Sequence, residues 1–167
     1  MNLIIHDLSK EQWEALAFPL KEETKIIDNS GKIKKCMGCF GCWLKTPGRC
    51  VIPDEYQRMG ELAAKAEELT IISKCSFGSY SSFVKNVLDR SISYVLPFFE
   101  IREGEMHHRK RYDNQFLMRV IFYGSDITEE EKETAKELVK ANAVNLHGKV
   151  KEVLFVESAE KIGEVFG

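Results

Sequence analysis

The sequence predicts an α/β fold in which a parallel β-sheet is covered by helices on both faces. Three observations support this fold class. Five short apolar runs typical of buried strands recur along the 167 residues, and each is followed by a segment whose apolar residues have helical spacing. Two capping boxes, Ser9 with Gln12 and Thr128 with Glu131, mark helix starts. Because strands that alternate with helices do not pair as hairpins, they are expected to run parallel.

The first half of the chain is expected to contain three strands and two helices. Residues 2–6 form an apolar run suited to a buried strand. The helix that follows must end before Pro19, because the residue preceding a proline avoids helical angles. A second strand is expected at about residues 24–28. Asp54 is expected to cap a second helix, and residues 69–73 form a central strand.

The second half continues the same alternation. The helix that follows the loop at residues 74–81 is expected to end at Pro97. Residues 98–115 show no clear period, which suggests an exposed excursion from the domain. The remaining expected elements are a strand at 116–123, a helix from Thr128 to near Gly148, a strand at 149–156 and a short helix at 158–166.

Composition limits the classes of function. A formal charge of -2 and a hydrophobic share of 44% provide no basic excess that would attract nucleic acid or an anionic membrane surface. We expect one domain, residues 1–167, with a cysteine-rich loop at about 31–53 and an excursion at about 97–115. The amino terminus does not have the pattern of a signal peptide, so a cytoplasmic location is expected. In that reducing compartment a cysteine cluster serves metal or redox chemistry more often than structural disulfides.

Three loops are expected to meet at the carboxyl ends of the strands, where sheets of this kind bind ligands. They follow His6, Ser73 and Tyr123. The second loop contains the segment Ser76 to Tyr80, which offers hydroxyl groups, a glycine and two aromatic rings. Such a loop suits a planar, phosphorylated cofactor.

The segment from Ser76 to Arg90, preceded by the compact cysteine stretch, resembles the flavodoxin-like family of NAD(P)H-dependent FMN reductases and iron-sulfur flavoproteins. The resemblance implies a three-layer sandwich with a five-stranded parallel sheet in the order 2-1-3-4-5. It also implies bound FMN, NAD(P)H as electron donor, and a homo-dimer or tetramer.

The same resemblance implies site residues. Flavin-bordering positions are expected at Ser76, Phe77, Gly78, Ser79, Tyr80, Tyr123, Gly124 and Ser125, with Ser9 at the phosphate. Tyr80 is the single candidate catalytic residue, through its phenolic hydrogen bond. Asp89 and Arg90 belong to the family pattern or form a structural pair. The first loop departs from the family, because Asp7 would repel a phosphate and few serines or glycines are present there.

Four cysteines, Cys36, Cys39, Cys42 and Cys50, have the spacing C-x2-C-x2-C-x7-C. This spacing is typical of [4Fe-4S] ligation, while zinc and a redox-active or empty thiol loop are alternatives. Because the stretch follows the second strand, it is expected at the same edge of the sheet as the flavin. Phe40 and Trp43 would shield a cluster, cover a flavin across a subunit contact, or simply anchor the loop. Phe98 and Phe99 suggest a lid, a dimer contact or core packing.

These observations favour a cytoplasmic FMN-dependent oxidoreductase. It would pass electrons from NAD(P)H to a small-molecule acceptor or redox protein, directly or through a cysteine-ligated cluster. The alternative is a non-enzymatic flavodoxin-fold module with a degenerate FMN site that acts in assembly or in metal or thiol binding. Neither nucleic acid nor membrane is expected as a partner.

Overall fold

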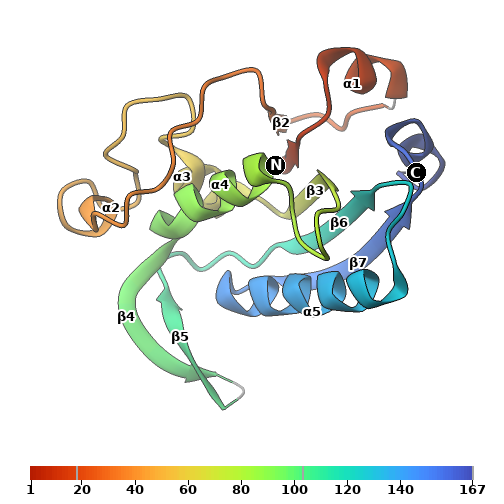
Figure 1. Cartoon of the computed structure of the whole chain (residues 1–167). Coiled ribbons are helices and arrows are strands. Elements are labelled where there is room, and N and C mark those ends of the chain that lie inside the picture. Colours follow the sequence, from red (N-terminus) through yellow and green to blue (C-terminus); the bar gives the residue numbers. More distant parts are fainter. Residues whose placement is uncertain (18, 103, 167) are drawn as a thin grey trace.

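The protein is built on a five-stranded parallel sheet with the strand order β2-β1-β3-β6-β7 (Figure 1). The computed structural model describes residues 1–17, 19–102 and 104–166. The strands are β1 (Asn2–His6), β2 (Thr24–Ile27), β3 (Glu68–Lys74), β6 (Leu117–Tyr123) and β7 (Lys149–Val156). This order confirms the predicted order 2-1-3-4-5, because β4 and β5 lie outside the sheet.

Helices cover both faces of the sheet. The helices are α1 (Lys10–Leu16), α2 (Gly41–Leu44), α3 (Met59–Lys65), α4 (Ser82–Arg90) and α5 (Glu129–Asn145), with 3₁₀ helices η1 (Ser91–Tyr94) and η2 (Ala159–Glu164). Helices α3, α4 and α5 share one buried cluster with the sheet, while α1 and η2 share the other. None of the helices in the described part of the chain combines the length and apolarity that crossing a bilayer requires.

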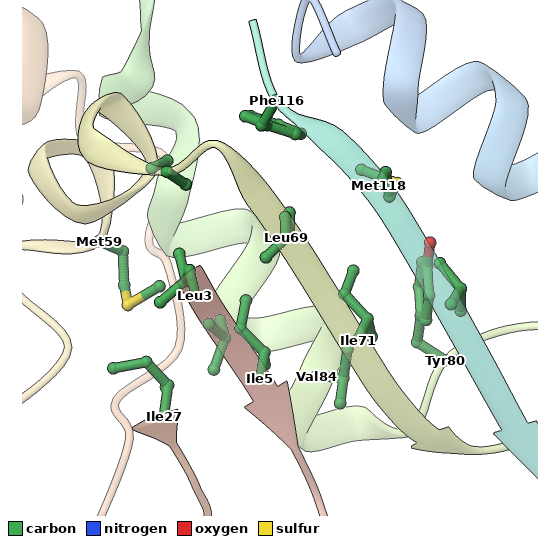
Figure 2. Close-up of a cluster of buried hydrophobic side chains, with 14 of the residues drawn as sticks. Leu3, Ile5, Ile27, Met59, Leu69, Ile71, Tyr80, Val84, Phe116 and Met118 are labelled. Atoms are coloured by element: carbon green, nitrogen blue, oxygen red, sulfur yellow. The ribbon is translucent and has the colours of Figure 1, made fainter. Parts of the chain in front are cut away.

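Successive side chains of each strand point to opposite faces of the sheet, which divides the core into two layers. Figure 2 shows Leu3, Ile5, Leu69 and Ile71 projecting from neighbouring strands toward Val84 of α4. The intervening strand residues belong to the other layer. Because successive side chains of a strand point to opposite faces, a sheet buried on both sides needs the continuous apolar runs that predicted these strands.

Both predicted capping boxes are present. The Ser9 hydroxyl accepts a hydrogen bond from the Gln12 N–H, and the Thr128 hydroxyl accepts one from the Glu131 N–H. Helix α1 ends at Leu16, which confirms that it stops before Pro19. These local signals located the helix starts correctly, because a cap satisfies backbone N–H groups within a few residues of itself.

Two predicted helix limits are wrong. Helix α3 begins at Met59 and not at Asp54, whose carboxylate accepts hydrogen bonds from the Tyr56 N–H and from the guanidinium of Arg90. Helix α4 ends at Arg90, and Pro97 lies within strand β4 rather than at a helix end. Asp54, which the local sequence predicts as a helix cap, thus pairs with an arginine 36 residues away.

The predicted irregular excursion is an antiparallel β-hairpin. Strand β4 (Val95–Arg102) pairs with β5 (Glu105–Lys110) in a register that places Phe99 opposite His108 and Glu100 opposite His107. The adjacent Phe98 and Phe99 and the polar run from His107 to Arg111 interrupt the alternation of apolar and polar residues, which obscures the strand pattern in the sequence. The adjacent histidines point to opposite faces, as expected for neighbours in a strand.

His147 attaches the hairpin to the end of α5. Its Nε2 lies 2.8 Å from the His108 carbonyl oxygen, and its Nδ1 lies 2.6 Å from Nη1 of Arg102. Because a guanidinium only donates, His147 accepts at Nδ1 and donates at Nε2, which requires the neutral ring. Burial lowers the pKa of His147, and the positive charge of Arg102 lowers it further.

We therefore expect stability to fall in mild acid. The unfolded chain takes up a proton at its ordinary pKa of 6.5 while folded His147 resists protonation, so this contribution is complete above pH 6.5 and decreases as pH falls below it. The His147→Asn variant should show a smaller drop in its urea midpoint between about pH 8 and pH 5. An unchanged pH dependence would contradict the assignment.

Candidate functional site at the carboxyl edge of the sheet

Three loops meet around the carboxylate of Asp7 at the carboxyl edge of the sheet. The Asp7 carboxylate accepts a hydrogen bond of 2.9 Å from the Lys74 N–H and one of 3.1 Å from the Tyr123 hydroxyl. The loops after β1, β3 and β6 are therefore joined, as the strand order predicted. Burial raises the pKa of Tyr123, and the charge of Asp7 raises it further, so the phenol remains a donor.

The loop after β3 presents an aromatic ring to solvent. Ser76 and Ser79 close a tight turn through two reciprocal backbone hydrogen bonds of 2.9 and 3.0 Å. At its tip the backbone is left-handed at Phe77 (φ 52°) and Gly78 (φ 70°), and the Phe77 side chain is 91% exposed. A Cβ at Gly78 would lie 2.8 Å from Cβ of Thr134, so only glycine fits against α5 there.

This turn lies next to the loop after β6. The Cys75 N–H donates a 2.9 Å hydrogen bond to the Tyr123 carbonyl, which joins the ends of the two loops. Ser76 and Ser125 are exposed beside them. An exposed aromatic ring and exposed hydroxyl groups at one edge suit the ring end of a flavin.

Tyr80 does not belong to this surface. Its side chain is only 5% exposed, its ring stacks on Phe122 at 5.4 Å, and its hydroxyl accepts a 3.4 Å hydrogen bond from the Asn142 amide. Figure 2 shows it among the core side chains of the sheet. Burial raises the pKa of Tyr80 to about 12. This placement argues against the prediction that Tyr80 contacts a flavin or acts in catalysis.

The backbone N–H and the hydroxyl of Ser9 are both hydrogen-bonded to residues of helix α1. Its N–H donates to the Gln12 side chain at 3.0 Å, and its hydroxyl donates to the Glu11 carboxylate at 2.9 Å. Helix α1 has only seven residues, and an acidic residue occupies its first turn. These contacts leave little at the helix start for the phosphate that Ser9 was predicted to hold.

The cavity beside the first loop is acidic. It has a volume of about 620 Å³ and is lined by His6, Asp7, Leu8, Ser9, Lys10, Gln12, Trp13, Glu14, Asp28, Asn29 and Ser30. Lys10 is the one lysine or arginine in that lining, against three carboxylates. Burial lowers the pKa of His6, which stacks on Trp13 at 4.1 Å, so the imidazole adds no charge at neutral pH. Three carboxylates against one lysine make this position unfavourable for a bound phosphate.

The cysteine stretch lies at the opposite end of the domain. The Sγ of Cys50 accepts a 3.2 Å hydrogen bond from Nε of Arg90, the last residue of α4. Because α4 runs back from the carboxyl edge, its end lies toward the amino ends of the strands. Figure 1 shows α2 near the start of β4, away from the arrowheads of β3, β6 and β7. The expectation of an edge shared with the flavin was wrong, because the connection after β2 carries the chain back across the domain.

The four cysteines line one cavity of about 700 Å³. Its lining comprises Cys36, Met37, Gly38, Cys39, Phe40, Cys42, Trp43, Cys50, Ile52, Asp89, Arg90, Ile92, Pro97, Phe99 and His108. Burial raises the pKa of Cys42, and the neighbouring Cys50 raises it further. Within the ranges 1–17, 19–102 and 104–166, no three histidine, cysteine or acidic side chains form a group that could hold a metal ion. The predicted [4Fe-4S] or zinc ligation by these cysteines is therefore not supported.

Asp89 and Arg90, for which the sequence left open a family role or a structural pair, each bind another residue. Lys85 pairs with Asp89 at 2.7 Å along the exposed side of α4, whereas the buried Arg90 pairs with Asp54 at 2.7 Å. Asp54 is 36 residues away in sequence, so no local pattern revealed it. The sequence shows the charge of Asp7, but only the fold shows that its carboxylate joins three loops.

Comparisons with known proteins agree with this architecture. No family model matches the sequence, and no curated protein matches it. Three solved structures align with 98% of this chain: azoreductase AzrA (9% identity, TM-score 0.57, 89% of that chain), general stress protein 14 from Treponema denticola in complex with FMN (10%, 0.57, 90%), and an FMN-dependent NADH-azoreductase from Bacillus anthracis in complex with FMN (13%, 0.52, 95%).

The fold is flavodoxin-like. At these identities the likeness concerns the fold and not the activity. In a flavodoxin-like sheet the ligand edge is the carboxyl edge, where Asp7, Phe77 and Tyr123 lie in this chain. The cysteine cavity is therefore a separate feature of this protein.

Proposed function

We propose that the protein is an FMN-dependent oxidoreductase that takes electrons from NAD(P)H and passes them to a small-molecule acceptor. The observation that carries this proposal is the exposed ring of Phe77 on a rigid turn at the ligand edge. Two of the structural neighbours are in complex with FMN, which adds support. When bound, FMN accepts hydride and releases electrons singly or in pairs.

The residues of this edge have distinct roles in the proposal. Phe77 would hold the flavin by stacking. Ser76 and Ser125 would offer it hydroxyl groups, and Gly124 would let the backbone approach it closely. Tyr123 is held by Asp7 and keeps the two loops at a fixed separation. The cysteine cavity has no role in the proposed electron transfer.

The acidic first loop implies that FMN binds weakly and exchanges with solvent. Asp7, Glu14 and Asp28 surround the position where a helix start would otherwise hold the phosphate. The same observation favours a second function, a non-enzymatic module that uses the flavodoxin-like scaffold for assembly. The two functions differ in whether FMN binds at all.

A titration of the purified protein with FMN decides between them. We expect saturable binding with a Kd of about 1–100 µM and FMN-dependent oxidation of NADH or NADPH followed by absorbance. Phe77→Ala should weaken binding about tenfold, because it removes the stacked ring. Phe98→Ala is the matched control, since Phe98 is also an exposed phenylalanine but lies on the hairpin. An absence of both binding and turnover would reject the enzyme and favour the module.

A further inference from the structure

A buried histidine in the wall of the acidic cavity has no partner for either of its ring nitrogens. His6 is 2% exposed, and its Nδ1 and Nε2 atoms have no hydrogen-bond partner among the described residues. The same side chain lines the cavity of about 620 Å³ beside the first loop. Because a buried polar atom without a hydrogen bond costs free energy, folded proteins seldom leave such atoms unpaired. Two unpaired nitrogens in the wall of a cavity therefore point to a ligand.

The register of the sheet places a carboxylate beside His6. Strands β1 and β2 run parallel with Ile5 opposite Ile27, so the next residues along, His6 and Asp28, are neighbours that project to the same face of the sheet. Burial lowers the pKa of His6 and the charge of Asp28 opposes this effect, as expected for a short separation. Asp7 follows His6 in the chain and lines the same cavity. Two carboxylates and one imidazole thus border one space.

The two aspartates have no cation paired with them. Lys10 is the one lysine in the lining, and its Nζ lies 3.8 Å from the Glu14 carboxylate. Within residues 1–17, 19–102 and 104–166, neither Asp7 nor Asp28 forms an ion pair with a lysine or arginine. Their hydrogen bonds come from neutral groups, such as the Ser30 N–H at 2.9 Å from the Asp28 carboxylate. The cavity therefore has an excess of negative charge and suits a cation.

The spacing of the acceptors favours an ammonium group over a metal ion. Metal ligands must converge on one point at about 2.0–2.6 Å, and no three histidine, cysteine or acidic side chains of the described chain are grouped in that way. An ammonium group donates three hydrogen bonds of about 2.7–2.9 Å in different directions, so its acceptors lie further apart. Asp7, Asp28 and the acceptor nitrogen of neutral His6 supply three acceptors.

We propose that this cavity binds a primary amine, with its ammonium group held by Asp7, Asp28 and His6. The rest of the amine would lie against Trp13, which lines the same cavity and stacks on His6 with the ring centroids 4.1 Å apart. A volume of about 620 Å³ is far larger than an ammonium group and lies within the range of pockets for small organic ligands. The ligand class is therefore a small amine with an apolar stem. This inference does not depend on flavin binding.

Calorimetric titration in the absence of FMN tests the site, with benzylamine as the probe. We expect benzylamine to bind with a Kd below about 1 mM. Benzyl alcohol lacks the charge, and benzyltrimethylammonium keeps the charge but lacks N–H donors, so both should bind at least about tenfold more weakly. The proposal is wrong if benzylamine does not bind at up to about 10 mM, or if the quaternary ion binds equally well. Saturation by manganese chloride without binding of benzylamine would make the cavity a metal site instead.

Two substitutions locate the binding site. Asp28→Asn keeps an oxygen that can accept from the Ser30 N–H but removes the charge, so benzylamine should bind at least about tenfold more weakly. His6→Phe keeps a ring against Trp13 but removes both unpaired nitrogens. This variant should be as stable in urea as the wild type without ligand, because no hydrogen bond is lost, and should also bind benzylamine at least about tenfold more weakly.

A matched control and a second readout separate binding from folding. Asp113→Asn makes the same change of charge at a fully exposed position beside the hairpin and should bind benzylamine as the wild type does. Because a ligand that binds only the native state stabilises it, benzylamine should raise the urea midpoint of the wild type and not that of His6→Phe. An equal rise in both proteins, or undiminished binding by Asp28→Asn, would overturn the assignment of the amine to this cavity.

Discussion

Arg90→Met is expected to lower the free energy of unfolding by about 3–5 kcal/mol. The Arg90 side chain is fully buried and binds the Asp54 carboxylate through two hydrogen bonds of 2.7 and 2.8 Å. Its other donors reach the carbonyls of Lys34 and Ile52 and the sulfur of Cys50. Methionine keeps much of the length but donates nothing, so a carboxylate and two carbonyls lose their partner.

Urea unfolding followed by circular dichroism measures this effect. Lys85→Met on the same helix is the matched control, because it breaks an exposed ion pair with Asp89 and should cost only about 0.3–0.5 kcal/mol. The loop from Lys34 to Asp54 should become more sensitive to proteolysis in Arg90→Met, since Arg90 holds it to α4. A loss below about 1 kcal/mol would show that the buried pair has little net effect on stability.

Asp7→Asn is expected to strengthen FMN binding by about 10- to 100-fold. A carboxylate several ångströms from a phosphate costs roughly 1–3 kcal/mol at the effective dielectric of a protein surface. The asparagine oxygen can still accept from the Lys74 N–H and the Tyr123 hydroxyl, so the junction of the three loops should persist. The gain should shrink at high salt, because mobile ions screen the repulsion.

The comparison needs a variant with the same change of charge elsewhere. Asp113→Asn serves this purpose, because Asp113 is fully exposed beside the hairpin and should leave the Kd for FMN unchanged. If Asp7→Asn left the affinity unchanged or reduced it, the phosphate of FMN would not lie at the first loop. The weak binding that we propose would then need another cause.

Much of the fold could be predicted from the sequence because its signals are local. Apolar runs such as residues 2–6 predict buried strands, and the Thr128 and Glu131 capping box placed the start of α5. Alternation of strand and helix then leaves few arrangements of a parallel sheet. The hairpin was missed because the adjacent Phe98 and Phe99 and the polar run from His107 to Arg111 interrupt the alternation of apolar and polar residues in its two strands.

The candidate site was predicted only in part. The loops after β1, β3 and β6 meet as expected, since parallel strands end at one edge. Tyr80 was assigned to this edge by its neighbours in sequence, but its ring fills the core against Phe122. The direction in which a loop side chain points depends on what packs around it, and sequence spacing does not contain that information.

The fold class and the acidic character of the first loop can be inferred from the sequence, and the strand order follows from the resemblance. The fold was needed to show that Asp7 joins three loops, that Arg90 pairs with Asp54, and that the cysteines lie far from the ligand edge. This difference follows from the range of the interactions. Strands and caps arise from neighbouring residues, whereas a buried ion pair or a shared cavity requires segments that only the folded chain brings together.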